Sequence, residues 1–249
     1  MKFYRYSKEQ LENEADKLNF EFDKQRLSKP KDIDVYDVVD FLGCTTDFLY
    51  LSPDQSILGM TSYNDGEYPV WIPLRELSET DAIEDKFVVH GLHPKKIFIK
   101  KGTIVVDRGL NESGDRGREN FTCIHECFHQ RLHLKCFKYC SGNYDYFSFR
   151  QNSRYLPGVS PKMTALEINE YQANYCAAAF LMPQMAVEFL LKKLMALKNL
   201  PNKPLPHTVE MDYIIREMAQ KFSVNYSPMK YRLQDLNLLE RNEGSLIFG

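Results

Sequence analysis

The sequence predicts an α+β fold, with a small, mainly antiparallel sheet in its first half and a helical C-terminal half. Two observations carry this expectation. Between residues 47 and 107, short runs of β-branched and aromatic residues alternate with turn-forming residues, which is typical of strands. After residue 163, apolar residues recur at helical spacing in segments that prolines separate, which is typical of packed helices.

Composition limits the kind of protein that this chain can be. Hydrophobic residues make up 43% of its 249 residues, which is enough for a packed core. The net charge of −2 provides no basic field for nucleic acid or membranes. We find no signal-peptide pattern at the N-terminus and no long apolar run, and we expect the six cysteines to be reduced thiols. We therefore expect a cytoplasmic protein that neither enters membranes nor binds nucleic acid directly.

The N-terminal residues predict a short helical segment, residues 1–45. Residues 7–19 have helical character, and Ser7 is a suitable N-cap. A polar connector at residues 29–34 contains a proline. A second helix is expected at residues 35–41, and Gly43 suits the position just after its end.

The next segment, residues 46–200, is predicted to form the core domain. Strands are expected at residues 47–52, 56–63 and 68–72. Residues 97–100 and 103–107 flank Lys101-Gly102 and predict a hairpin. Together these runs predict a sheet of three to five strands.

The remaining segments are predicted to be helices and one long loop. Helices are expected at residues 118–135, 163–181 and 185–197, and two more at 209–222 and 228–236 form a C-terminal subdomain, residues 201–249. Residues 140–161 read as a loop. Its aromatic residues could line a substrate cleft or hold the loop against the core; they are Tyr144, Tyr146, Phe147, Phe149 and Tyr155.

The helix at residues 118–135 contains the motif His125-Glu126-Cys127-Phe128-His129. Histidines four residues apart on a helix differ by about 40° in direction and about 6 Å in rise, so both imidazoles can bind one metal ion. Glu126 can then contact a water on that ion without being a ligand. This is the zincin arrangement, in which zinc activates the water and the glutamate takes its proton.

A catalytic zinc ion usually takes a third protein ligand. His133 lies about 12 Å along the helix from His125, which is too far for a shared ion, so it is expected in the second shell or facing solvent. The candidates are Glu167 and Glu170 on the alanine-rich helix, and residue geometry alone does not choose between them. Asn174, four residues after Glu170, could steady the carboxylate or a histidine.

The motif and the alanine-rich helix together resemble the ImmA/IrrE family of zinc metallopeptidases. The resemblance rests on Phe121-Thr-x-x-His-Glu-x-x-His129 followed by Glu170-x-x-Ala-Asn-x-x-Ala-Ala-x-Phe-Leu-Met-Pro183. It covers roughly residues 97–183. One departure is visible, because Phe128 stands where the family usually has glycine, and this bulky side chain is expected to reshape the cleft or the packing around it.

The resemblance implies a zinc-dependent endopeptidase with one zinc ion per chain. His125 and His129 correspond to the histidine ligands, Glu170 to the third ligand and Glu126 to the general base. Members of the family typically cleave a cognate helix-turn-helix repressor, often of a mobile element or prophage or in a stress response. The expected partner is therefore a protein substrate of that kind, whose cleavage releases its genes from repression.

The sequence contains two weaker patterns. Cys123, Cys127, Cys136 and Cys140 have a spacing that could bind a second, structural zinc, but the first two face away from the histidines, so buried thiols are favoured. Residues 214–239 have a helix-turn-helix cadence, in which Lys230, Tyr231 and Arg232 would face DNA. We favour a supporting role for these helices.

The alternative function is that of a regulator whose metal site is structural or vestigial. Such a protein would bind DNA through residues 209–239, or would sequester a repressor without cutting it. Neither activity would depend on Glu126.

Overall fold

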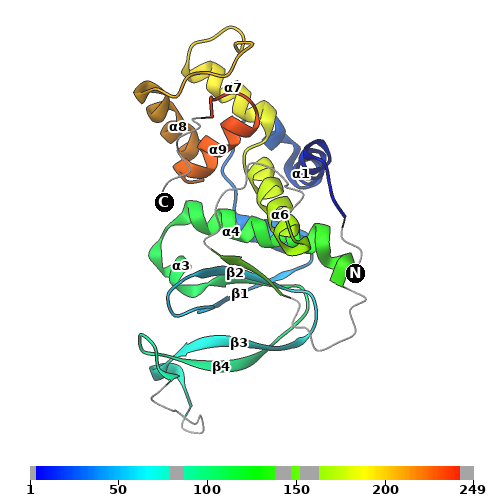
Figure 1. The fold of residues 1–249 in the computed structure, drawn as a ribbon, viewed down its shortest axis with the longest axis vertical. Helices are drawn as coiled ribbons and strands as arrows, with labels where there is room; N and C mark the ends of the chain where they lie inside the picture. Colours follow the sequence, from blue (N-terminus) through cyan, green and yellow to red (C-terminus); the bar gives the residue numbers. More distant parts are fainter. Residues whose placement is uncertain (1–3, 79–86, 138–146, 152–162, 242–249) are drawn as a thin grey trace. The chain divides into compact units, whose positions relative to one another are not determined.

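The computed structural model describes residues 4–78, 87–137, 147–151 and 163–241 (Figure 1). Contacts within the chain divide it into two compact units. The sheet unit consists of Met1–Arg5, Asp34–Arg154 and Ser160–Ala173, and the helical unit of Tyr6–Ile33, Tyr155–Val159 and Asn174–Gly249.

The sheet unit contains a four-stranded sheet in the order β1-β5-β2-β6. Its strands are β1 (Thr45–Leu49), β2 (Ile57–Ser62), β5 (Thr103–Asp107) and β6 (Phe147–Gln151). β1 and β5 are parallel, whereas β2 is antiparallel to both β5 and β6. A second, two-stranded antiparallel sheet pairs β3 (Gly66–Pro73) with β4 (Leu92–Ile99). The predicted α+β fold with small, mainly antiparallel sheets is confirmed.

The core of this unit includes side chains from both sheets. Met60 and Val105 come from the four-stranded sheet, and Tyr68 and Ile99 from the two-stranded one. In the first part of β3, Tyr68 and Val70 are buried, whereas Glu67 and Pro69 are exposed, which is the alternation expected of a strand with one covered face.

The predicted hairpin at residues 97–107 is wrong. β4 pairs with β3, and β5 lies between β1 and β2 in the other sheet. Every residue of β5 is buried, whereas β4 is largely half-exposed or exposed. A strand that is buried on both faces belongs in the middle of a sheet, so the turn at Lys101-Gly102 links two sheets.

Short helices precede and connect these strands. α2 (Val35–Phe41) ends as predicted, because Gly43 adopts a φ of +70°. η2 (Leu74–Glu76) follows β3. α3 (Arg108–Ser113) was not predicted; Asp107 caps it by accepting a hydrogen bond from the Leu110 amide at 3.2 Å.

The helix that carries the histidine motif lies across the four-stranded sheet. It comprises α4 (Arg116–Phe128), a π-helical turn η4 (His129–His133) and α5 (Leu134–Phe137). The Gln130 amide joins helix to sheet, since its Nε2 donates to Thr61 Oγ1 at 2.6 Å and to the Ser62 carbonyl at 2.9 Å. In Figure 1, α4 runs over β2 on the face opposite β3 and β4.

The other helices agree with prediction to within a few residues. They are α1 (Lys8–Asp23), α6 (Ala165–Leu181), α7 (Gln184–Leu194), α8 (Val209–Lys221) and α9 (Tyr226–Asp235). The short η1 (Lys24–Leu27), which follows α1, was not predicted. Ser7 caps α1 in a capping box with Gln10. α6 contributes its residues up to Ala173 to the sheet unit and the remainder to the helical unit.

Two buried arginines hold the helical unit together. Arg232 on α9 pairs with the Glu12 carboxylate on α1, and its Nε donates to the Met182 carbonyl at 2.9 Å. Arg26 donates from Nε to Asn19 Oδ1 at 3.1 Å and contacts the Phe180 carbonyl. Both guanidinium groups therefore satisfy carbonyls at the C-terminal end of α6, which have no partner within the helix.

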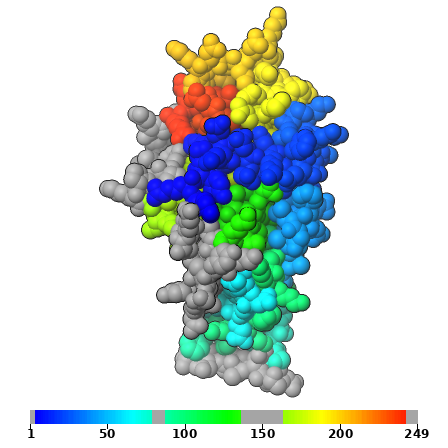
Figure 2. Space-filling view, turned by 90° about the vertical axis from the view of Figure 1, so that its right-hand side faces the viewer, coloured from blue at the N-terminus to red at the C-terminus, as the bar shows by residue number. Residues whose placement is uncertain are grey.

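These contacts explain why the unit boundaries differ from the predicted segments. α1 groups with α9 and the end of α6, which Figures 1 and 2 also show, although more than 150 residues separate them in sequence. The predicted N-terminal segment, residues 1–45, is thus divided between the units. Pairings over such distances leave no local pattern in the sequence.

Replacing Arg232 with Met is expected to destabilise the protein by about 3 kcal/mol, because it leaves the Glu12 carboxylate and the Met182 carbonyl without their buried donor. Arg241→Met is the matched control; that arginine also pairs with a carboxylate, Asp235 at 2.8 Å, but its own side chain is 43% exposed, and loss of such an ion pair costs at most about 1 kcal/mol. Urea unfolding of both variants measures the difference. Equal destabilisation would contradict the role given to Arg232.

The predicted helix-turn-helix pattern corresponds to α8 and α9. Four residues join the two helices, and one of them, Ser223, has a left-handed backbone conformation (φ +53°). Arg232, however, is 1% exposed and bound to Glu12, so it does not face solvent as a DNA-reading residue would. Lys230 and Tyr231 are half-buried. The contacts of Arg232 indicate that this residue stabilises the helical unit.

Within the described part of the chain, no helix is both long enough and apolar enough to cross a membrane. The predicted loop at residues 140–161 contains strand β6. The side chains of its aromatic residues lie outside the described residues.

Candidate metal centre

The motif residues lie on a helix that is buried along most of its length. Asp115 caps α4 by accepting a hydrogen bond from the Arg118 amide at 3.1 Å. His125, Glu126 and His129 are at most 1% exposed. Since α4 lies against the sheet, polar side chains at these positions need polar partners or a ligand.

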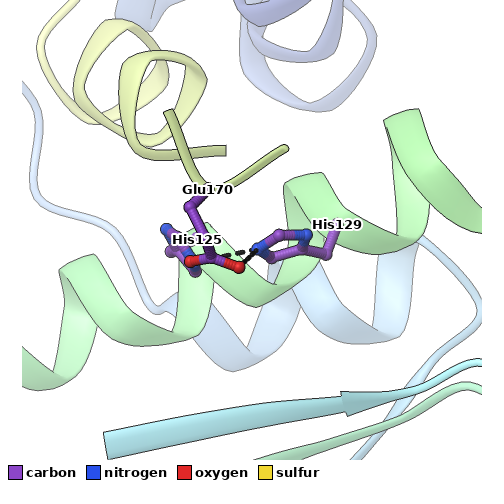
Figure 3. Close-up of side chains that lie close together, drawn as sticks. All are labelled: His125, His129 and Glu170. Atoms are coloured by element: carbon purple, nitrogen blue, oxygen red, sulfur yellow. Dashed lines mark hydrogen bonds and ion pairs between the residues drawn. The ribbon is translucent and has the colours of Figure 1, made fainter. Parts of the chain in front are cut away.

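α6 brings a carboxylate to the two histidines (Figure 3). Glu170 Oε2 lies 3.2 Å from His125 Nε2, and Glu170 Oε1 lies 3.2 Å from His129 Nε2. The two Nε2 atoms are 3.0 Å apart. In the described part of the chain, these three residues form the only group of three or more side chains placed to hold a metal ion.

The dimensions of this cluster fit a zinc ion. Ligands about 2.0 to 2.1 Å from a tetrahedral ion lie about 3.4 Å from one another. The three distances here, 3.0 to 3.2 Å, are close to that value. Two imidazoles and one carboxylate are also the set that catalytic zinc sites use with one position open. The arrangement can therefore hold a divalent ion and leave space for water or a substrate oxygen.

The geometry also distinguishes the two candidate glutamates. Glu167 is exposed, and its carboxylate accepts hydrogen bonds from the amide (2.7 Å) and hydroxyl (2.9 Å) of Thr164. The Glu167 amide in turn donates to Thr164 Oγ1 at 3.2 Å, which completes a capping box at the start of α6. Glu170 is therefore the third candidate ligand, and Glu167 is a helix cap.

The charge state of Glu170 suits a ligand. Burial disfavours its ionised form, but the charge of His129 and hydrogen bonds from both histidines outweigh burial and hold the pKa of Glu170 well below its usual range. Burial, with a contribution from His129, lowers the pKa of His133 to about 3. The cluster thus combines an ionised carboxylate with a neutral histidine beside it.

The side chain of Glu126, which belongs to α4, lies against strand β2. A Cβ atom added at Gly59 would lie 3.0 Å from Glu126 Oε1 and 2.7 Å from Thr122 Cγ2. β2 also has a register irregularity between Ile57 and Gly59 where it pairs with β6. The absence of a side chain at Gly59 is what allows the strand to approach the glutamate this closely.

Gly59→Ala is expected to displace Glu126 and Thr122, at a cost of about 1–3 kcal/mol in stability and with a loss of any activity that needs Glu126. Metal binding should persist, because the three atoms nearest to the added Cβ belong to Thr122 and Glu126 and not to a candidate ligand. Thermal unfolding, zinc titration and an activity assay measure the three effects. A fully active variant would contradict the close contact. Gly66→Ala is the control, since its nearest neighbour is at an ordinary 3.6 Å.

The remaining predicted residues lie around this cluster. The His133 ring is in contact with His129 and lies outside the group of three candidate ligands. Asn174 is half-buried, one turn beyond Glu170 on α6, and its support of Glu170 stays a prediction. Phe128, at the usual glycine position, is fully buried immediately before the π-helical turn.

Comparison of the sequence with protein-family models and with curated proteins finds no match. The motif residues and their geometry are therefore what supports any assignment of function.

Two residues near the cluster were not predicted. Gly59 has no sequence signature, because its role depends on a contact with another element. Gln172, on α6, bonds to His133, and the regular spacing of His125, His129 and His133 could have indicated that the third histidine has a partner.

Cys123 and Cys127 are free, buried thiols, as expected. Burial and the neighbouring Cys123 raise the pKa of Cys127. The side chains of Cys136 and Cys140 lie outside the described residues, so the predicted C-x3-C…C-x3-C pattern is described only for its first half.

Proposed function

We propose that the protein is a zinc-dependent endopeptidase of the ImmA/IrrE type, with a zincin-like site that cleaves a helix-turn-helix repressor. The observation that carries the proposal is the convergence of His125, His129 and Glu170, at ligand distances, beside a buried Glu126. The sequence resemblance supports the substrate class.

The site residues divide the chemistry among them. Bound by His125, His129 and Glu170, zinc would supply Lewis acidity toward a carbonyl oxygen and toward water. Glu126 would accept a proton from the attacking water and pass it to the leaving amine. The Glu126 side chain is fully buried, which keeps bulk solvent away from its carboxylate.

Incubation with a panel of purified helix-turn-helix repressors tests the proposal, with mass spectrometry to locate new chain ends. We expect a discrete cut in one repressor, lost on chelation and restored by zinc. A repressor that binds tightly and stays intact in the presence of zinc would instead favour the sequestering alternative. The burial of Arg232 argues against direct DNA reading as a third outcome.

A further inference from the structure

A chain of hydrogen bonds leads from the metal cluster to a backbone carbonyl. His129 Nδ1 lies 2.9 Å from His133 Nδ1, and His133 Nε2 lies 3.0 Å from Gln172 Oε1. Gln172 Nε2 donates to the Tyr4 carbonyl at 2.9 Å. His129, His133 and Gln172 are at most 1% exposed, and every member of the chain belongs to the sheet unit.

The Tyr4 carbonyl sets the direction of the whole chain. A carbonyl only accepts, so the Gln172 group that faces it is the NH₂ and the group that faces His133 is the oxygen. That oxygen also only accepts, so His133 Nε2 carries a proton. In a neutral imidazole the other nitrogen is then the acceptor, and His133 Nδ1 accepts from His129.

The consequence reaches the metal cluster. Because His129 Nδ1 donates its proton to His133, the proton that Glu170 accepts from His129 is the one on Nε2, and the lone pair of the ring is on Nε2 once that proton leaves. Nε2 is the atom that lies 3.2 Å from Glu170 Oε1 and 3.0 Å from His125 Nε2. The opposite direction of bonding would keep a proton on Nε2 of the neutral ring, where it would prevent binding to an ion.

We propose that His133 and Gln172 are positioning residues that fix His129 in the tautomer and ring orientation required for metal binding. The inference rests on the proposed zinc site, and it gives a role to two residues that lie outside the group of candidate ligands. The π-helical turn His129–His133 places the two rings 5.0 Å apart between centroids. Single π-helical turns of this kind occur often at functional sites.

Zinc affinity of the full chain, measured by competition with a chelating dye, tests the inference. Removing a partner of a metal-bound histidine typically costs 10- to 100-fold in metal affinity. We expect a loss of about that size in His133→Phe, which removes the acceptor, and in Gln172→Met, which removes both ends of the amide. His133→Asn keeps an amide oxygen near the place of Nδ1 and is expected to recover most of the affinity.

Gln130→Met is the matched control. Gln130 is also a buried glutamine beside the cluster, but its amide bonds to Thr61 and Ser62 of β2. It should lose stability and keep wild-type zinc affinity. Circular dichroism and thermal unfolding of the metal-free proteins identify variants that are folded when zinc is added.

Folded His133→Phe or Gln172→Met protein that binds zinc within about twofold of wild type would overturn the inference and leave the zinc site intact. Should one of these variants not fold, the other, together with the His133→Asn comparison, decides the result. A wild-type chain that binds no zinc would contradict the proposed function itself, and with it the positioning role.

Discussion

Glu126→Gln is expected to abolish cleavage while leaving zinc binding unchanged. The amide has the shape of the carboxylate but does not accept a proton, and general acid–base catalysis contributes about 10²- to 10⁴-fold to rate. Glu126 is not among the three clustered ligands, so the metal site should remain. The rate is measured by following, over time, the cleavage of the repressor that the panel experiment identifies. Zinc titration of the same sample checks the site.

Glu119→Gln is a close control for that experiment. Glu119 is also a buried glutamate of α4, but its carboxylate accepts hydrogen bonds from Tyr36 and Asn111, away from the metal cluster. We expect it to retain activity. A Glu126→Gln protein that cleaves at the wild-type rate would assign the proton transfer to another group and remove the main support for a zincin-type mechanism.

The second large effect is expected from Glu170→Ala. Structural zinc sites bind with about 10–16 kcal/mol, shared among four ligands, so one ligand accounts for about 2.5–4 kcal/mol, or roughly 60- to 700-fold in affinity. Zinc affinity should fall because the variant lacks the charged member of the cluster and retains only the two histidines. Zinc affinity by chelator competition gives the value.

Glu167→Ala separates ligand loss from damage to α6, because Glu167 lies on the same helix and only caps it. Its zinc affinity should equal that of wild type, and its stability should fall by about 1 kcal/mol. If Glu167→Ala lost zinc and Glu170→Ala kept it, the assignment of the third ligand would be reversed.

The motif helix and the helical second half could be predicted because their signals are local. His125 and His129 are one helical turn apart, and α6, α7, α8 and α9 show helical periodicity between prolines. Residue geometry alone does not choose between Glu167 and Glu170, and only the family resemblance points to Glu170. The order Thr164-Ala-Leu-Glu167 is, however, a capping-box pattern that could have assigned Glu167 to the helix end.

Features that depend on distant segments could not be predicted. The hairpin at residues 97–107 followed from a turn signal, but the burial of β5 on both faces is decided by β1 and β2. The pairing of Glu12 with Arg232 and the approach of Gly59 to Glu126 also join residues far apart in sequence. The bond from Gln172 to the Tyr4 carbonyl is of the same kind.

The zinc content of the wild-type chain tests the central claim most directly. Protein prepared with zinc available, then freed of loosely bound ions by dialysis, would be measured by elemental analysis. The arrangement of His125, His129 and Glu170 predicts about one zinc ion per chain. A folded protein that holds no zinc under these conditions would contradict the metal site and the peptidase function that depends on it.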